Sequence, residues 1–315
     1  MSEALTLKAG SNLEKVLTAG KFAVTGECGP PKSADASVIE KKVKLLIGYV
    51  DAVNVTDNQT AVVRVSSVAS AYLAQQNGIE AVMQMTCRDR NRLAMQADIL
   101  GASVLGLKNI LCLTGDHVSF GNHPQAKGVH DLDSISLIRM YKDMRDEKRF
   151  QSGEEMDVAP PLYIGCAENP FGDPLEFRAM RLKKKVVAGA DFVQTQCIFN
   201  IPRFKQWMEA VRALGVHQEI KILAGITPIK SAGMANYMKK FVPGMDVPQE
   251  IIDRIAAKEK GEAQQAEGKK LAVEMIKELA EVEGVAGVHI MAVEWEAAVP
   301  EIVEAAGLMP RPAVA

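Results

Sequence analysis

Carboxylate and amide side chains stand at the ends of several short apolar segments, where they could act on a bound ligand. The first such segment ends in TGECGPP (residues 25–31), which places Glu27 between two glycines and before two prolines. Because glycine and proline favour tight turns, this carboxyl is held at a defined point, as a general acid requires. The alternative is that Glu27 caps a helix or pairs with a basic side chain.

Polar residues end the other apolar segments as well. The full set is Glu27, Thr56, Asp57, Gln84, Thr86, Thr114, Asp116, Glu168, Asn169, Gln194, Gln196, Thr227 and Glu294. Turn formation and capping account for the aspartates and Thr227. They do not account for the three glutamines, which lie inside apolar segments, where an unpaired amide costs about 1–3 kcal/mol. These amides therefore favour a ligand site at one end of the segments.

The apolar segments that carry these residues have the length of buried strands. They occupy residues 22–28, 50–57, 80–87, 109–116, 161–168, 191–199, 220–227 and 287–294. Between them, apolar residues recur at three- and four-residue spacing, which predicts helices, one of them over residues 134–146. Eight alternating strands and helices predict an α/β fold, the (β/α)8 TIM barrel, which displays its chemistry at the C-terminal ends of the strands.

Residues 1–315 are predicted to form a single barrel domain, since no linker or low-complexity tract interrupts the pattern. A short helix over about residues 11–18 is expected to close the bottom of the barrel. Ser11 and Glu14 have the spacing of a capping box at its start.

Composition argues against several classes of partner. The formal net charge is −2, and the longest basic run, residues 181–185, is interrupted by Leu182. This run is expected to be a solvated helix face rather than a surface for nucleic acid or an anionic membrane. The five cysteines are spread singly, which is typical of reduced thiols. The N-terminus has no apolar signal segment, and no apolar window approaches the ~18 residues that cross a bilayer. We therefore expect a cytoplasmic protein.

The strand ends also lack the residues of other barrel chemistries. There is no H-x-H on the first strand and no lysine at a strand end, which disfavours a metal-dependent hydrolase and a Schiff-base aldolase. Neither G-x-G-x-x-G nor a P-loop occurs. His289 lies in the middle of the last strand and is expected to be a core residue. The cysteines are expected to be small buried apolar residues.

Six segments resemble, in order and along nearly the whole chain, motifs of the methylenetetrahydrofolate reductase family. GECGPP (26–31) is similar to E-x-x-P-P, MQMTC (83–87) to H-L-T-C, and LTGD (113–116) to the R-G-D-like strand end. LKKKVVAGADFVQTQCIFN (182–200) resembles the K-R-K-x-x-A-G-A…T-Q-x-x-F-D segment. VNVTDN (53–58) and AGITPI (224–229) complete the set.

The resemblance implies a barrel with flavin at its mouth, which reduces 5,10-methylenetetrahydrofolate to 5-methyltetrahydrofolate in one-carbon metabolism and methionine biosynthesis. Glu27 would be the general acid that opens the folate ring, and hydride would pass from reduced flavin N5 to a 5-iminium cation. Asp116 would bind the pterin and stabilise this cation, and Gln196 would hold the folate. The implied flavin-binding residues are Thr56, Gln84, Thr86, Gly115, Asn169 and Lys185.

The sequence departs from the family pattern near the flavin and near the folate tail. Gln84 replaces a histidine, Thr114 an arginine, and Glu294-Trp295 the usual Asn-Arg. These changes leave open FAD, which we prefer, or FMN. They also leave open NAD(P)H or an iron–sulfur partner subunit as electron donor, and a homo-oligomer or a hetero-complex. Two alternatives stand: a pterin-binding barrel methyltransferase without flavin, and a flavin-bearing electron-transfer subunit of a larger reductase complex.

Overall fold

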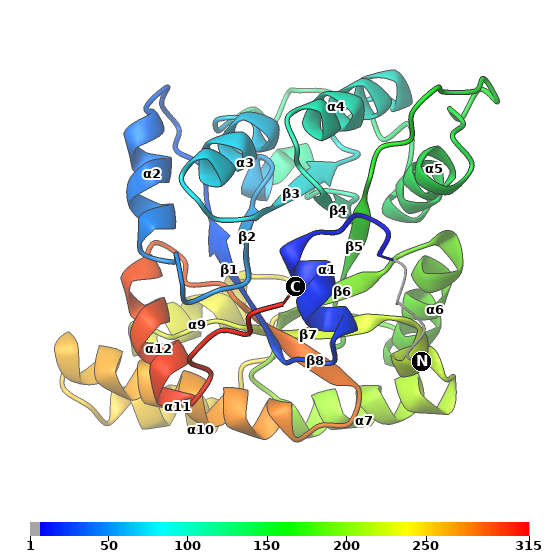
Figure 1. The fold of residues 1–315 in the computed structure, drawn as a ribbon. Coiled ribbons are helices and arrows are strands. Elements are labelled where there is room, and N and C mark those ends of the chain that lie inside the picture. The colour runs from blue at the N-terminus through cyan, green and yellow to red at the C-terminus, as the bar shows by residue number, and fades with distance from the viewer. Residues whose placement is uncertain (1–6, 315) are drawn as a thin grey trace.

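The computed structural model describes residues 7–314. Eight parallel strands close into a barrel in chain order, with β1 paired to both β2 and β8 (Figure 1). The strands are β1 (Ala23–Cys28), β2 (Ala52–Val55), β3 (Ala81–Thr86), β4 (Asn109–Leu113), β5 (Tyr163–Glu168), β6 (Phe192–Cys197), β7 (Lys221–Ile226) and β8 (Val285–Ile290). Each strand begins within two residues of the start of the corresponding predicted segment. The predicted TIM barrel is therefore confirmed.

One helix precedes β1 and packs on the lower end of the barrel interior, and the later helices follow the strands and cover the outside of the barrel. The helices are α1 (Asn12–Thr18), α2 (Ala36–Lys44), α3 (Ser67–Gln76), α4 (Arg92–Val104), α5 (Ser134–Asp146), α6 (Arg178–Ala188), α7 (Ile201–Ala213), α8 (Val216–Glu219), α9 (Ala232–Phe241), α10 (Gln249–Ala256), α11 (Glu262–Ala280) and α12 (Val299–Ala305). Short 3₁₀ turns, η1 (Gln59–Ala61), η2 (Val118–Phe120), η3 (Leu175–Phe177) and η4 (Glu296–Ala298), lie in the connections. Helix α5 has the bounds that the sequence predicts.

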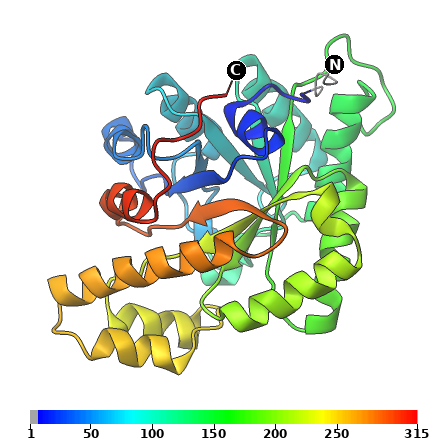
Figure 2. The same ribbon diagram turned by 60° about the horizontal axis from the view of Figure 1, so that its bottom comes forward.

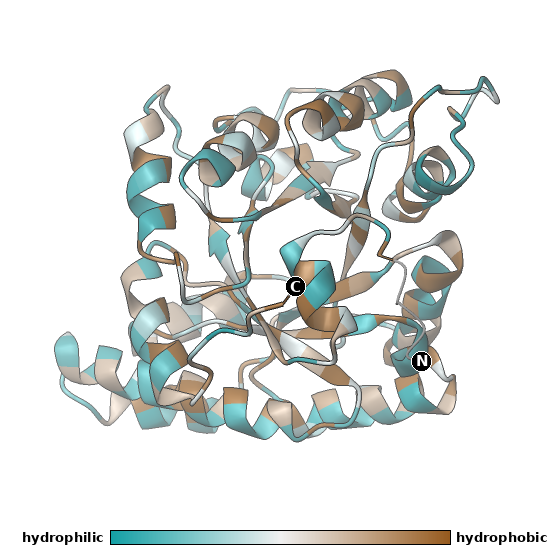
Figure 3. Ribbon diagram, in the orientation of Figure 1, coloured by the Kyte–Doolittle hydropathy of each residue, from teal (hydrophilic) through white to brown (hydrophobic). Residues whose placement is uncertain are grey.

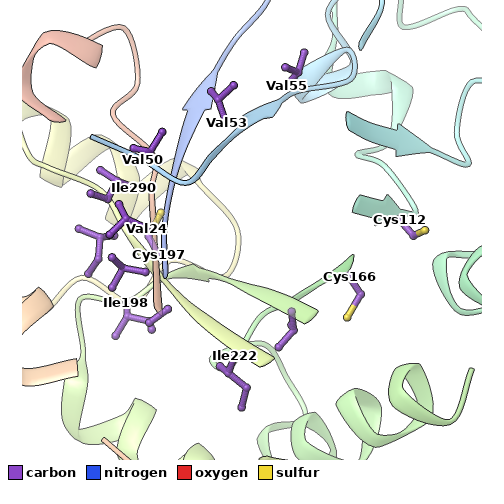
Figure 4. Packing of buried hydrophobic residues seen from close by; sticks show 14 of the residues in the cluster. Val24, Val50, Val53, Val55, Cys112, Cys166, Cys197, Ile198, Ile222 and Ile290 are labelled. Atoms are coloured by element: carbon purple, nitrogen blue, oxygen red, sulfur yellow. The ribbon is translucent and has the colours of Figure 1, made fainter. Parts of the chain in front are cut away.

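The helices carry hydrophilic and hydrophobic residues on different faces (Figure 3). Their apolar faces pack on the outward side chains of the strands and form the larger of two cores. Figure 4 shows part of this core, with Val24, Val53, Cys112 and Cys166 on the outer surface of the sheet. Because side chains alternate along a strand, the neighbouring residues point into the barrel.

The smaller core fills the lower half of the barrel interior. Its members come from the barrel strands, from α1 and from the segment before α1: Ala9, Leu13, Val16, Leu17, Ala23, Ala52, Val82, Leu111, Tyr163, Phe192 and Leu223. The rings of Tyr163 and Phe192 stack with centroids 5.1 Å apart. Gly165 leaves room for this stack, since a Cβ there would lie 2.2 Å from the Phe192 ring.

Helix α1 begins with a different set of hydrogen bonds from the predicted capping box. The Ser11 hydroxyl accepts from the Glu14 amide at 3.1 Å, as expected. The Glu14 carboxylate, however, accepts from the amides of Lys8, Ala9 and Gly10 rather than from Ser11. Glu14 thereby fixes the segment that leads into α1.

The connection between β7 and β8 adds three helices at one side of the barrel. Helices α9 and α10 lie against each other, and α11 runs from them back to the sheet (Figure 2). Across residues 7–314, every helix is too short or too polar to span a bilayer.

Candidate active site

A cavity of about 340 Å³ opens at the C-terminal ends of the strands. Five of the nine residues that the family resemblance assigns to the site line this cavity: Glu27, Gln84, Asn169, Lys185 and Gln196. They come from β1, β3, β6, α6 and the segment after β5. The structure therefore brings into one cavity residues that lie up to 169 positions apart, because strand ends meet at the mouth of a barrel.

Glu27 stands at the edge of this cavity with its side chain 12% exposed. It belongs to the inward set of β1, together with Ala23 and Thr25, which differ from it by even numbers of positions. Its Oε2 lies 3.7 Å from Nε2 of His289, whose side chain is 3% exposed. His289 is inward on β8 and lines the same cavity.

Beneath Glu27 the barrel interior holds a hydrogen-bonded polar group. The side-chain amides of Asn54 and Gln194 donate to each other across the barrel. Gln194 Nε2 also donates to Thr25 Oγ1 at 3.2 Å, and Thr25 Oγ1 lies 2.9 Å from His289 Nδ1. We call Thr25, Asn54, Gln194 and His289 the interior network. Every member is buried, so the pairing removes a large desolvation cost.

Basic side chains gather at the opposite side of the cavity, on α6. Lys185 is buried, lies 2.8 Å from Glu168 Oε2 and also donates to the Ala167 carbonyl. Arg178 is 3.8 Å from the other oxygen of Glu168, and Arg181 lines the same wall. In this structure the Lys185 ammonium, expected from the sequence to meet a cofactor phosphate, is paired with a carboxylate.

The remaining predicted residues lie at the edge of the mouth formed by β2, β3 and β4. Thr86 is held by Asp57, which accepts from its amide and hydroxyl at 2.9 and 3.0 Å. Gly115 has φ +93°, and a Cβ there would lie 3.0 Å from Arg88 and 3.1 Å from Thr86, so the close approach requires glycine. Thr56 is buried, and its hydroxyl has no hydrogen-bond partner among the described residues.

Asp116 is exposed and does not line the cavity that contains Glu27. Its Oδ2 accepts from the amide of Thr60 in the β2 loop at 3.1 Å. The two carboxylates predicted to flank a ligand are thus placed differently, one inside the cavity and one on the rim.

Arg88 holds the loops of this edge together. Its guanidinium donates to the carbonyls of Asn58 and Asp116, each at 3.2 Å, and to both carboxylate oxygens of Asp89 at 2.7 and 2.6 Å. The hydrogen bond with Asp89 raises the pKa of Arg88. Loops that follow β2, β3 and β4 are therefore joined through one fully buried side chain.

The loop after β8 carries the substituted pair Glu294-Trp295. Glu294 has φ +49° and is held by two lysines. Lys230 Nζ donates to its carbonyl at 2.6 Å, and Lys42 Nζ lies 3.1 Å from its carboxylate. Lys230 also stands 5.8 Å from the Trp295 ring centroid. Glu294 thus engages two cations beside the mouth, and Trp295, at the position where the family motif has arginine, packs near one of them.

All five cysteines are buried and unpaired. Burial raises the pKa of the Cys28, Cys87, Cys166 and Cys197 thiols to about 12. Among residues 7–314, no three His, Cys, Asp or Glu side chains gather in a group that could hold a metal ion.

Reasoning from the sequence missed four residues of this region: Glu168 as the partner of Lys185, Arg178, Arg88 and His289. His289 had a usable signal, because it alternates with Gly287 and Met291 and so shares the inward face of its strand. The prediction of a core residue was right about its burial and its hydrogen bond. It was incomplete because the side chain also borders the cavity.

Comparison with known proteins shows which family this chain resembles. The family model for methylenetetrahydrofolate reductase matches residues 12–307. A Caenorhabditis elegans protein named probable methylenetetrahydrofolate reductase (NADPH) is 28% identical over 77% of this chain and 34% of its own length. A Pectobacterium carotovorum protein named 5,10-methylenetetrahydrofolate reductase is 24% identical over 76% and 78% of the two chains. This chain thus spans about a third of the eukaryotic relative.

A solved structure supports the fold. A Clostridium thermocellum protein, described as binding two copies of 5-methyl-5,6,7,8-tetrahydrofolic acid, superposes with a TM-score of 0.63 at 15% identity. The likeness covers 95% of this chain and all of that one. The family match extends over nearly the whole described barrel, and the chain therefore belongs to the methylenetetrahydrofolate reductase family.

Proposed function

We propose that this protein reduces 5,10-methylenetetrahydrofolate to 5-methyltetrahydrofolate with a bound flavin. The observation that carries the proposal is Glu27, a carboxyl held inside a cavity that is bordered by amides and cations. Family membership supports it, as do the names of the relatives. The C. thermocellum neighbour is described as binding the product of this reaction.

In this proposal Glu27 gives its proton to N10 of the folate, so that the five-membered ring opens to a 5-iminium cation. An acid is needed because the amine is a poor leaving group until it is protonated. Gln196 holds the pterin in position, since its amide lines the same cavity. Holding the folate against a planar hydride donor supplies the orientation that the transfer requires.

The residues at the mouth fit a flavin. Thr56 offers a buried hydroxyl without a protein partner, and Gln84 and Asn169 line the cavity. Thr86 and Gly115 form a close-packed edge beside it. Lys185, with Arg178 and Arg181 near it, provides a cationic wall for a phosphate. Bound flavin would supply the hydride; we propose FAD, with FMN as the alternative.

Asp116 remains in the proposal as the carboxylate that binds the pterin and stabilises the cation. Its oxygen now accepts from Thr60, in the loop that follows β2. Its part in the reaction therefore depends on the position of the β4–α5 loop when folate is bound.

The electron donor is proposed to be NAD(P)H or an iron–sulfur partner subunit. The C. elegans relative carries NADPH in its name. Anaerobic mixing of the oxidised protein with NADH and NADPH separately tests direct reduction. Bleaching of the flavin by either nucleotide supports direct use, and no bleaching by both favours a partner protein.

An absorption spectrum of the purified protein, reconstituted with FAD or FMN, is the first test. Flavin bands and their bleaching by 5-methyltetrahydrofolate under anaerobic conditions support the reductase. A protein that binds methyltetrahydrofolate but takes up neither flavin would instead be a pterin-binding methyltransferase.

Substitution of Glu27 then tests the mechanism. We expect Glu27→Gln to bind flavin and folate normally while oxidation of its reduced flavin by methylenetetrahydrofolate slows by at least about 10²-fold, the usual contribution of a general acid. Glu154→Gln, an exposed carboxylate in the β4–β5 connection, is the matched control. Near-normal turnover of Glu27→Gln would remove Glu27 from the reaction.

A further inference from the structure

His289 lies directly behind the proposed acid. Its Nε2 is 3.7 Å from Glu27 Oε2, and its Nδ1 is 2.9 Å from Thr25 Oγ1. Both ring nitrogens therefore face oxygen atoms of β1. The imidazole is buried but lines the cavity through the side that faces Glu27.

We infer that His289 is a positioning residue that orients Glu27 and stabilises its carboxylate after the proton has passed to the folate. This inference rests on the proposed function. A histidine buried only for packing would not donate a hydrogen bond to the Glu27 carboxylate.

The interior network favours the tautomer of His289 that carries its proton on Nε2. Gln194 and Asn54 satisfy each other, and the second N–H of Gln194 Nε2 donates to Thr25 Oγ1. The Thr25 hydroxyl, which accepts this bond, lies 2.9 Å from His289 Nδ1 and 3.5 Å from the Val288 carbonyl, and we assign its proton to the shorter contact. Nδ1 is then an acceptor, and in the neutral ring the proton lies on Nε2, which faces Glu27.

The 3.7 Å separation is longer than a hydrogen bond, but such contacts at active sites shorten when the substrate is bound. Glu27 is the penultimate residue of β1 and is only partly buried, so its terminal oxygen can approach Nε2 by rotation of the side chain. Thr25 and Gln194 hold the ring in place, which leaves the carboxyl as the partner that moves.

The other titratable groups near Glu27 do not supply the same stabilisation. Cys197 of β6 is a protonated thiol, because burial raises its pKa to about 12, and it contacts Thr227 at 2.7 Å. Lys42 of α2 pairs with Glu294 and Glu296. Cys28 lies on the outer surface of β1, with its pKa also raised by burial.

The proton balance of the step is simple. One proton leaves Glu27 for the folate nitrogen, and the resulting carboxylate accepts a hydrogen bond from Nε2–H without gaining a proton. No proton passes to His289 in this step. A proton from water restores Glu27 when the product leaves. Because a hydrogen bond to the charged form of an acid favours that form, His289 makes proton release easier.

The test compares His289→Met, which removes the donor, with His289→Gln, which places an amide N–H near the position of Nε2. Flavin is loaded and reduced with dithionite, and its oxidation by methylenetetrahydrofolate is followed in a stopped-flow instrument from pH 5 to 9. His217→Met, a half-buried histidine on α8 before β7, is the control.

For His289→Met we expect oxidation to slow by about 10- to 100-fold, the size of losing one hydrogen bond to a charged group. The pH at which the rate falls on the alkaline side should rise, because the protonated form of Glu27 is then favoured. Reduction by dithionite and the affinity for 5-methyltetrahydrofolate should stay unchanged. His289→Gln should recover most of the rate.

Equal losses in His289→Met and His289→Gln, with an unmoved alkaline limb, would overturn the inference and leave His289 a packing residue. If His289→Met does not fold, Thr25→Val tests the same inference. This variant keeps the imidazole ring but removes the hydroxyl beside Nδ1, so the proton is no longer held on Nε2. A wild-type protein whose reduced flavin is not oxidised by the folate would defeat the proposed function itself. A wild type that reacts, with normal His289 variants, defeats the inference alone.

Discussion

The lower and upper halves of the barrel interior are built on opposite principles. In the lower half the inward side chains are apolar and continue into α1, with Phe192 stacked on Tyr163. In the upper half the next inward positions on the same strands are Thr25, Asn54 and Gln194, which hydrogen-bond to one another. A step of two residues along these strands therefore leads from the packed apolar core to the interior network.

The difference shows where this fold is stabilised and where it works. Burying apolar surface in the lower half contributes free energy without a need for exact partners. Polar groups of the upper half gain little net stability, since their hydrogen bonds replace bonds to water. Their hydrogen bonds instead fix the orientation of the side chains beneath Glu27. Substitutions in either half of the interior test this difference.

The largest effect on stability is expected in the lower half. Phe192→Ala should lower the free energy of unfolding by about 4 kcal/mol, as large-to-small changes in a fully buried aromatic do. Denaturant titration measures the change. The matched control is Phe120→Ala, at a 63% exposed phenylalanine, which should change stability by less than about 0.5 kcal/mol. Equal effects at the two sites would contradict the packed apolar core of the lower half.

The next effect concerns the buried ion pair at the mouth. Glu168→Gln should destabilise the protein by about 3 kcal/mol, because it leaves Lys185 as a buried charge without its carboxylate. The double variant Glu168→Leu/Lys185→Met should regain most of that loss, since an apolar pair of similar size needs no charge compensation. Thermal unfolding of the flavin-free protein gives the stabilities.

Flavin titration of the same variants separates stability from function. If Lys185 receives a cofactor phosphate, the double variant should bind FAD at least about tenfold more weakly, although it folds well. FAD binding as tight as in the wild type would show that the pair is structural.

The smallest effect is expected from the interior network. Gln194→Leu should cost about 1–3 kcal/mol of unfolding free energy, because Asn54 is left buried without its amide partner. Gln76→Leu, at an exposed glutamine that ends α3, is the control. A stabilised Gln194→Leu variant would mean that the upper half behaves like the lower one.

The barrel itself could be predicted from the sequence because strand ends, helix spacing and turn residues all agree on it. The strand termini differ from the prediction mostly at their C-terminal ends. Strands β2, β4 and β8 end at Val55, Leu113 and Ile290, whereas the predicted segments continue to residues 57, 116 and 294. The polar residues at these strand ends belong to loops. The periodicity of apolar residues alone does not show where a strand ends and its loop begins.

The candidate site was predicted only in part, for reasons that differ between residues. Glu27 and Gln196 could be placed because each stands at the end of a strand and on its inward face. Lys185 could be placed on the cavity wall, but its ion pair with Glu168 depends on the spacing of two elements. Arg88 could not be recognised, because it acts on backbone carbonyls, which carry no sequence signature.

Arg88 also divides the mouth into two parts that we expect to move differently. It fastens the loops after β2, β3 and β4 to one another, so none of them can open unless all three shift together. On the other side, β6–β7 and β7–β8 each contain a register shift, and the loops after β7 and β8 are joined by a surface contact, from Lys230 to the Glu294 carbonyl. Amide exchange should accordingly be slow and concerted along the β2–β4 edge, and a bulky ligand should enter past β6 to β8.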